Sequence, residues 1–147
     1  MTFAEHLNQA IGAEVTCAKT VAESDVMLFA GITGDFSDNH VNEQAMAKTA
    51  YGGRIAHGAL LVGYMSRAST LITDKCPDLM ASHCPVSLGY DRVRFLRGVR
   101  IGDTLTISYR IASVDAAKSR TAATVEMTNQ RGETCAAATH IMTWIAR

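Results

Sequence analysis

The run from Ala59 to Ile72 constrains the fold of this chain more than any other segment. Its order, Ala-Leu-Leu-Val-Gly-Tyr-Met-Ser-Arg-Ala-Ser-Thr-Leu-Ile, leaves the first two helical turns almost without a polar face. Such a helix is buried on most sides, because a helix at a protein surface keeps a polar face toward water. Another part of the chain must therefore wrap around it.

The second half of the chain supplies candidates for that wrapping. Four segments alternate between apolar and polar residues or are rich in β-branched residues: 86–99, 104–114, 120–128 and 134–145. The stretches between them contain Gly, Asp and Asn, which are typical of turns. We expect an α+β fold in which an antiparallel meander surrounds one long helix.

The first half predicts shorter elements. A first strand is expected at 14–21, followed by a helix at 25–32 with Ser24 as its N-cap and a helix at 43–48 capped by Asn42. Pro77 and Pro85 bracket residues 78–84, which we expect to form a flexible loop between the buried helix and the strands.

Composition narrows the class of protein. The chain has 147 residues and is 48% hydrophobic, which suits one domain spanning 1–147 with a real core. It carries 14 basic and 14 acidic residues, so the general attraction to nucleic acid or anionic lipid is missing. Neither a signal peptide nor a membrane span is recognisable, and we expect a cytoplasmic protein. The four cysteines show no CxxC or zinc-type spacing, so no disulfide and no metal site are expected.

The residues with the clearest chemical potential are Asp35 and His40. They lie five positions apart in a stretch rich in Gly, Ser, Asp and Asn, which we do not expect inside a helix. Gly58 follows and opens the apolar helix, whose first free amides can bind an oxyanion. A carboxylate, an imidazole and a backbone donor are the parts of an acid/base site for a carbonyl compound. His57, just before the helix, is expected to orient the turn through a backbone hydrogen bond.

Three stretches carry a resemblance to a known family. They are Gly34-Asp35-Phe36 with His40, Gly53 to Gly58, and Phe95 to Leu105. In these stretches the chain resembles the MaoC-like dehydratases, the (R)-specific enoyl-CoA hydratases of the hot-dog fold. The resemblance runs from the first expected helix to the last strand. It implies a curved antiparallel sheet around a long central helix, a homodimer, no cofactor, and reversible syn addition of water to a trans-2-enoyl-CoA.

The resemblance also assigns roles. Asp35 and His40 match the catalytic pair, and Gly58 matches the glycine whose N–H faces the thioester oxygen. Ser66 matches a serine of the central helix. It lies eight residues beyond Gly58, roughly 12 Å at helical rise, so we expect it to support the pair from a distance or to bond back to the preceding turn.

Arginines are the expected contacts of CoA. The guanidinium group matches phosphate geometry, and we hypothesise that one or two of Arg54, Arg94 and Arg97 reach the CoA phosphates. The alternative is that each is solvated on an outer face of the sheet.

One departure from the family pattern lies inside the motif. Ser37-Asp38 stands where Asn-Pro is common, and it adds a second carboxylate beside the pair. An inward Asp38 would change the proton affinity of the pair, whereas an outward one would be a turn residue.

Two other function classes remain open. Thioesterases and carrier-protein dehydratases of this fold place an acidic residue on a helix, but 59–72 contains no Asp or Glu. A non-catalytic acyl-CoA-binding module would tolerate loss of the Asp35 and His40 pair, which this chain has retained. The favoured interpretation is an enoyl-CoA hydratase with acyl-CoA as its partner. A homodimer would cover the sheet edge that one copy leaves open.

Overall fold

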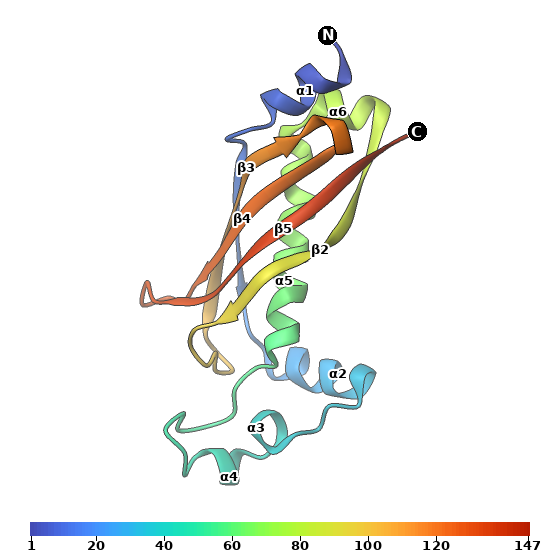
Figure 1. Cartoon of the computed structure of the whole chain (residues 1–147). Helices are drawn as coiled ribbons and strands as arrows, with labels where there is room; N and C mark the ends of the chain where they lie inside the picture. The colour runs from blue at the N-terminus through green and yellow to red at the C-terminus, as the bar shows by residue number, and fades with distance from the viewer.

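A single sheet wrapped around one helix organises the molecule (Figure 1). The computed structural model describes all 147 residues. Its five antiparallel strands stand in the order β1-β3-β4-β5-β2. The strands are β1 (Glu14–Thr20), β2 (His83–Phe95), β3 (Thr104–Asp115), β4 (Arg120–Thr128) and β5 (Thr134–Ala146). The helices are α1 (Phe3–Gln9), α2 (Glu23–Thr33), α3 (Asp38–Val41), α4 (Glu43–Met46), α5 (Gly58–Leu71) and α6 (Pro77–Ser82), with 3-10 turns η1 (Ile72–Lys75) and η2 (Ala116–Lys118).

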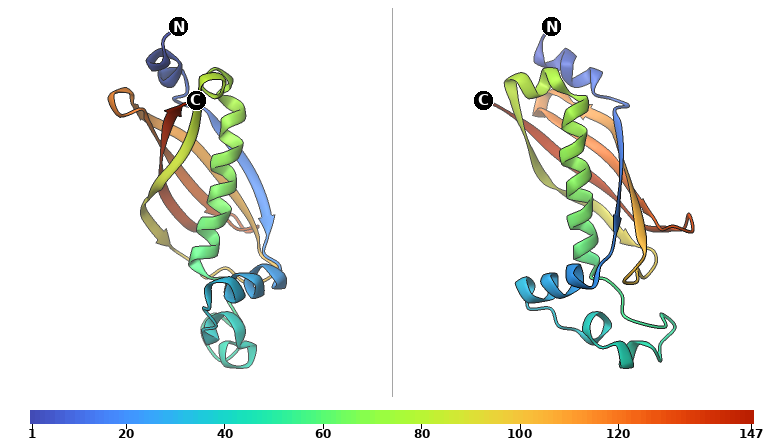
Figure 2. Two further views of the ribbon diagram at one scale, coloured as in Figure 1. Left: turned by 90° about the vertical axis from the view of Figure 1, so that its right-hand side faces the viewer. Right: turned by 180° about the vertical axis from the view of Figure 1, so that it is seen from behind.

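The apolar side of α5 forms the centre of the core. Leu61, Met65 and Ala68 recur at the spacing of one helix face and are fully or almost fully buried. They belong to one cluster of 24 buried hydrophobic residues, to which β3 contributes alternate residues such as Ile107 and Ile111. Figure 2 shows α5 lying along the concave face of the sheet. The predicted α+β hot-dog architecture is therefore confirmed.

The expected boundaries hold best where hydrophobic periodicity was strongest. The central helix and the strands β1, β3, β4 and β5 begin and end within three residues of their predicted positions. Strand β2 begins within three residues of its predicted start but ends early. That strand stops at Phe95 rather than near residue 99, and its pairing with β5 shifts between Asp91 and Arg94. Such a bulge bends the strand, which a regular alternation in the sequence does not reveal.

Two local predictions were wrong. Residues 78–84 are not a loop, because Pro77 starts α6 at a position where a missing N–H costs nothing, and β2 follows directly. The N-cap of α2 is Ala22 and not Ser24, because the carboxylate of Asp25 accepts the Ala22 N–H at 2.8 Å.

Two helices have no counterpart in the sequence-based expectations. Helix α1 begins with a capping box in which Thr2 and Glu5 exchange hydrogen bonds. Helix α3 is a single turn that contains His40, inside the stretch that we expected to lack helix. None of the six α-helices is long and apolar enough to cross a lipid bilayer.

Residues 22–57 project beyond the end of the sheet, and we call this segment the overhang. It contains α2, α3 and α4, which lie together at the N-terminal end of α5 (Figure 1). Helices α1 and α6 lie at the opposite end of α5 (Figure 2). The overhang is the part of the fold that carries Asp35, His40 and His57.

A fully buried histidine on β5 is bonded to hydroxyl groups from β2 and β3. His140 on β5 has its Nδ1 2.7 Å from the Tyr109 hydroxyl and its Nε2 2.8 Å from the Ser87 hydroxyl, and its ring stacks on Tyr90. Because hydroxyl groups both donate and accept, they satisfy the neutral ring. Burial lowers the pKa of His140 to about 4.

This depressed pKa predicts a loss of stability in acid. Below about pH 6.5, the ordinary pKa of histidine, the His140 imidazole binds a proton in the unfolded chain but stays unprotonated in the folded chain. The free energy of unfolding should therefore fall as the pH drops from about 6.5 toward 4, by roughly 2 kcal/mol at pH 5 at 1.4 kcal/mol per pH unit. Urea unfolding at pH 7 and pH 5 measures this difference. His140→Gln, which cannot titrate, should show a smaller difference; an unchanged one would contradict the assignment.

Candidate active site

The end of α2 sets the position of Asp35. Gly34 ends the helix in the left-handed conformation, with a φ of 77° that favours glycine, and its N–H donates to Ala30. The chain turns there, and the Asp35 N–H donates to the Thr33 hydroxyl at 3.2 Å. As a result Asp35 leaves the helix and faces α3.

His40 is held by a backbone carbonyl. The ring is buried, and its Nδ1 lies 2.7 Å from the carbonyl oxygen of Ile55. A carbonyl can only accept, so Nδ1 carries a hydrogen and donates it. In the neutral ring, Nε2 is then the unprotonated nitrogen. The Ile55 carbonyl thus fixes which nitrogen is available for chemistry.

The two side chains face each other across a narrow gap. Asp35 Oδ2 and His40 Nε2 are 3.9 Å apart. This distance is too long for a direct hydrogen bond, and it leaves space for one water molecule to bond both atoms. The structure therefore brings together the carboxylate and the imidazole that the sequence singled out.

The Asp35 carboxylate is prepared to stay ionised. Its Oδ1 accepts hydrogen bonds from the Ser37 hydroxyl at 2.8 Å and from the Ser37 N–H at 3.3 Å. These two bonds, in that order, lower the pKa of Asp35, and the charges of His40 and His57 contribute less. The side chain is 47% exposed, so water also solvates the charge.

His57 contacts both members of the pair. Its ring stacks on the ring of His40 with centroids 3.7 Å apart, and its Nε2 lies 3.0 Å from the backbone oxygen of Asp35. The expected backbone hydrogen bond is therefore present. His57 also ends the overhang and is the N-cap of α5, so it links the pair to the start of the central helix.

Asp35, His40 and His57 could offer ligand atoms within 4.8 Å of one another. The two imidazole rings, however, are stacked with an interplanar angle of 24°. The in-plane lone pairs of stacked rings lie in nearly parallel planes, whereas a metal ion needs lone pairs that converge on one point. One nitrogen of each ring also faces a backbone oxygen. This arrangement suits positioning of the pair better than binding of a metal ion.

Gly58 is the first residue of α5. The first amides of a helix have no acceptor within it, and no backbone hydrogen bond outside the helix uses the Gly58 N–H. The helix dipole adds positive potential at this end. An added Cβ would lie 2.5 Å from Cε2 of Phe95, so the ring packs directly on the glycine. The missing side chain thus makes room for the Phe95 ring, and the free amide suits a site for a partially negative oxygen.

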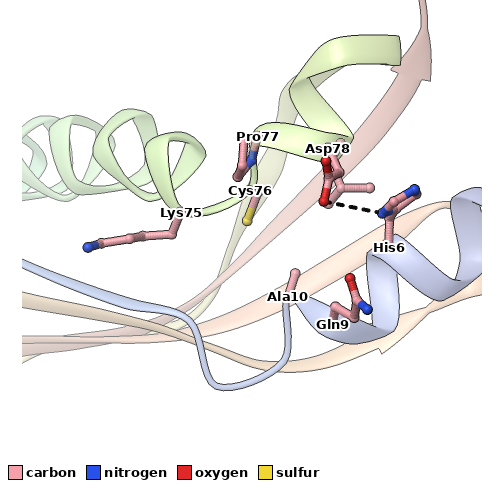
Figure 3. A pocket seen from close by; sticks show the side chains of 8 residues that line it. His6, Gln9, Ala10, Lys75, Cys76, Pro77 and Asp78 are labelled. Carbon is pink, nitrogen blue, oxygen red and sulfur yellow. Dashed lines mark ion pairs between the residues drawn. The ribbon is translucent and has the colours of Figure 1, made fainter. Parts of the chain in front are cut away.

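A cavity of about 350 Å³ lies beside His40 and Gly58. Eight of its thirteen lining residues are hydrophobic, which suits an apolar part of a ligand. Polar contacts come from His40, Asn39 and, at the mouth, the 57% exposed side chain of Arg97. A second cavity of about 60 Å³, shown in Figure 3, lies between α1 and α6 and contains none of the predicted site residues.

Ser66 and Asp38 make no hydrogen bond to the pair. Ser66 lies on α5, is exposed, and has no hydrogen bond to Asp35 or His40; its carbonyl accepts from the Ser69 hydroxyl. Asp38 is exposed and accepts from the side chain of Asn42, so it behaves as a turn residue and not as part of the pair.

The three arginines differ in their exposure and in how many carboxylates they already bind. Arg97 lines the cavity and has one ion pair, at 3.6 Å, with Glu133. Arg94 is exposed, and its Nη1 donates to the carbonyl of Val93. Arg54 is largely enclosed and bonds two carboxylates, so it has no free face for a phosphate. The arrangement therefore does not support a role for Arg54 in binding CoA.

Two site residues were not anticipated from the sequence. Ser37 lies two residues after Asp35, a spacing at which hydroxyl groups often bond an aspartate, so local chemistry could have found it. The carbonyl of Ile55 meets His40 only through the folded overhang, and no residue type marks it.

Comparison with known proteins identifies the family of this chain. A family model described as "MaoC like domain" matches residues 4–134. An (R)-specific enoyl-CoA hydratase of Rhodospirillum rubrum is 36% identical over 103 residues, covering 70% of this chain and 66% of the relative. A 3-hydroxybutyryl-CoA dehydratase of Methylorubrum extorquens is 32% identical over 104 residues, covering 71% and 61%. The chain thus spans somewhat less than two thirds of the length of these curated relatives.

Solved structures show the same fold. The R-hydratase PhaJ1 from Pseudomonas aeruginosa has a TM-score of 0.76 at 25% identity, covering 93% of this chain and 83% of that one. A structure titled as a monoamine oxidase regulatory protein from Archaeoglobus has a TM-score of 0.77 at 31% identity, covering 93% and 90%. The match to the family model covers most of the chain. This chain belongs to the MaoC-like dehydratase family.

Proposed function

We propose that this protein adds water to trans-2-enoyl-CoA thioesters to give (R)-3-hydroxyacyl-CoA, and catalyses the reverse reaction. The observation that carries the proposal is the 3.9 Å gap between Asp35 Oδ2 and His40 Nε2. His40 and Gly58, whose N–H has no backbone acceptor, line the same cavity. Hydration of an unsaturated thioester needs a base, an acid and a donor for the carbonyl oxygen, and these groups supply all three.

The hydrogen bonds around Asp35 and His40 suggest which role each residue has in the reaction. One water donates a hydrogen to each of Asp35 and His40. His40 Nε2 takes a proton as the water oxygen bonds to the β carbon, and the electron pair of the C=C bond moves toward the thioester. The imidazolium then returns a proton to the α carbon on the same face, which restores the enzyme. Asp35 orients the water and stabilises the imidazolium, while the Gly58 N–H binds the enolate oxygen.

The cavity beside the pair suggests where the substrate binds. Its hydrophobic lining suits the apolar parts of an acyl thioester, and Arg97 at its mouth can pair with a CoA phosphate. Arg94, three residues before Arg97, is also exposed. We assign the CoA contacts to these two residues. Ser66 is retained only as a supporting residue of the central helix.

We also propose a homodimer formed at the β2 edge. Strand β2 pairs with β5 alone, and Val86 and Leu88 on it are 41% and 49% exposed. The other edge, β1, exposes polar residues such as Glu14 and Thr16. An open strand edge with exposed apolar side chains favours pairing with a second copy, whereas a polar edge resists it.

Substitution of the pair tests the proposed reaction. Asp35→Asn and His40→Ala should each lower turnover of crotonyl-CoA by at least about 100-fold, the lower end of what a positioned acid or base contributes, because His40 carries out both proton transfers and depends on Asp35 for the water and for the imidazolium charge. Loss of absorbance of the enoyl thioester measures the rate, and chiral analysis of the product measures the stereochemistry. Wild-type activity that survives both changes would reject the roles of the two residues.

The role of Gly58 can be tested by removing its N–H. Proline is tolerated at the first position of a helix, and the ψ of 134° at His57 suits a following proline. Gly58→Pro should lower kcat by about 100- to 1,000-fold, the usual effect of losing one oxyanion donor. Gly58→Ala is the matched control, because it also displaces Phe95 but keeps the N–H. Equal losses in the two variants would assign the effect to crowding.

Sedimentation tests the dimer. The mass of the wild type measured by sedimentation should be twice the 15.8 kDa of the chain. Leu88→Glu places a charge on the β2 edge and should shift the protein to the monomer, whereas Thr16→Glu on the β1 edge should leave the dimer intact. A monomeric wild type, or a dimer broken by Thr16→Glu alone, would contradict the β2 assignment.

A further inference from the structure

Arg54 makes the most extensive set of ion pairs in the overhang. Its Nη1 and Nη2 donate to the two carboxylate oxygens of Glu23 at 2.8 and 2.7 Å, and its Nε donates to Glu43 at 3.0 Å. The Arg54 side chain is only 14% exposed, although both carboxylates are more than half exposed. Two-point pairing of a guanidinium with a carboxylate restricts direction as well as distance.

The two carboxylates mark the boundaries of the catalytic segment. Glu23 is the first residue of α2, and Glu43 is the first residue of α4. Asp35 and His40 both lie between these two residues in the chain. Arg54 therefore ties the start of α2 to the start of α4 and closes the segment that carries the pair.

Arg54 also adjoins the backbone that binds His40. The next residue, Ile55, accepts the His40 Nδ1 hydrogen and donates its own N–H to Asn39 at 2.9 Å. The N–H of Ala56 donates to Val99 at 2.7 Å, which anchors this backbone to the segment that follows β2. A shift of the Arg54 backbone would thus move the acceptor that orients the imidazole.

The charges argue against a second role in binding phosphate. The hydrogen bonds that Arg54 donates, first to Glu23 and then to Glu43, raise the pKa of Arg54 above its usual value. A CoA phosphate would have to displace a carboxylate that is already bonded at two points. Arg97, whose one ion pair is 3.6 Å long, has no such competition.

We propose that Arg54 is a positioning residue that holds Asp35 and His40 at the separation needed for one shared water. The proposal rests on the proposed hydratase function, because the separation matters only if the pair acts on water. Misplacement of a catalytic group by about 1 Å can cost about 100-fold in rate. Loss of the Arg54 contacts should therefore lower kcat with little change in KM.

Two substrates distinguish a positioning role of Arg54 from a role in binding the CoA phosphates. Crotonyl-CoA carries the CoA phosphates, whereas the N-acetylcysteamine thioester of crotonate carries none. Arg54→Lys keeps the charge but loses the two-point geometry, and it should lower kcat about 10- to 100-fold for both substrates with KM changed less than about threefold. Arg54→Ala should have a larger effect in the same direction. If the alanine variant does not fold, Glu23→Gln, at a half-exposed site, should lower kcat for both substrates.

Arg131→Lys is the matched control. Arg131 also contacts two carboxylates, Asp103 and Glu133, but it lies in the turn between β4 and β5. This control should keep the wild-type kcat, with circular dichroism checking the fold of every variant.

Each outcome decides between distinct conclusions. A raised KM for crotonyl-CoA alone would overturn the proposal and return Arg54 to phosphate binding. An unchanged kcat in Arg54→Lys and Glu23→Gln would show that the ion pairs do not position the site. A wild type that hydrates neither thioester would instead reject the proposed function and leave the geometry of Arg54 without a catalytic consequence.

Discussion

Burial of α5 against the sheet determines where the rest of the molecule can lie. Its apolar side contributes Leu61, Met65 and Ala68 to the core, so the axis and the start of the helix are fixed by packing. The start of the helix then lies at one end of the sheet, where Gly58 presents an amide without an acceptor. The overhang reaches this point through His57, the N-cap of α5. The core thus places the proposed oxyanion donor, and the overhang carries Asp35 and His40 at the same end of the helix.

Different surroundings give the members of the pair different tasks. Asp35 receives two hydrogen bonds from Ser37 that favour its charged form. His40 gives one hydrogen to the Ile55 carbonyl and keeps the other nitrogen toward Asp35. Asp35 is thus favoured as a carboxylate, and the tautomer of His40 is set by a carbonyl that can only accept. The division of roles follows from hydrogen bonds made outside the gap itself.

The sequence predicted what depends on local pattern. Hydrophobic periodicity located α5 and the strands, and the motif indicated that Asp35 and His40 would lie close together, as they do. The path of the overhang was beyond such reasoning. The single turn of α3 is too short for a periodic signal, and the Ile55 carbonyl meets His40 fifteen residues away in the chain. Arg54 illustrates the same limit, because its residue type suits a phosphate as well as a carboxylate, and only the fold brings Glu23 and Glu43 to it.

The proposed reaction uses one water molecule, and the single chain leaves the candidate site open to bulk water. The Asp35 side chain is 47% exposed, and bulk water weakens any charge interaction that it makes. Beside it the overhang exposes large apolar residues, with Leu28 at 67%, Ile32 at 81% and Phe36 at 56%. Apolar surface of this extent next to a charged group becomes useful when something covers it, because the covering layer removes bulk water from the carboxylate. In the proposed function a bound acyl thioester would cover the side toward the cavity, and in the proposed dimer a second copy at the β2 edge would extend the sheet beyond it. In this arrangement the same exposed residues that make one chain incomplete would leave the gap between Asp35 and His40 with a single water.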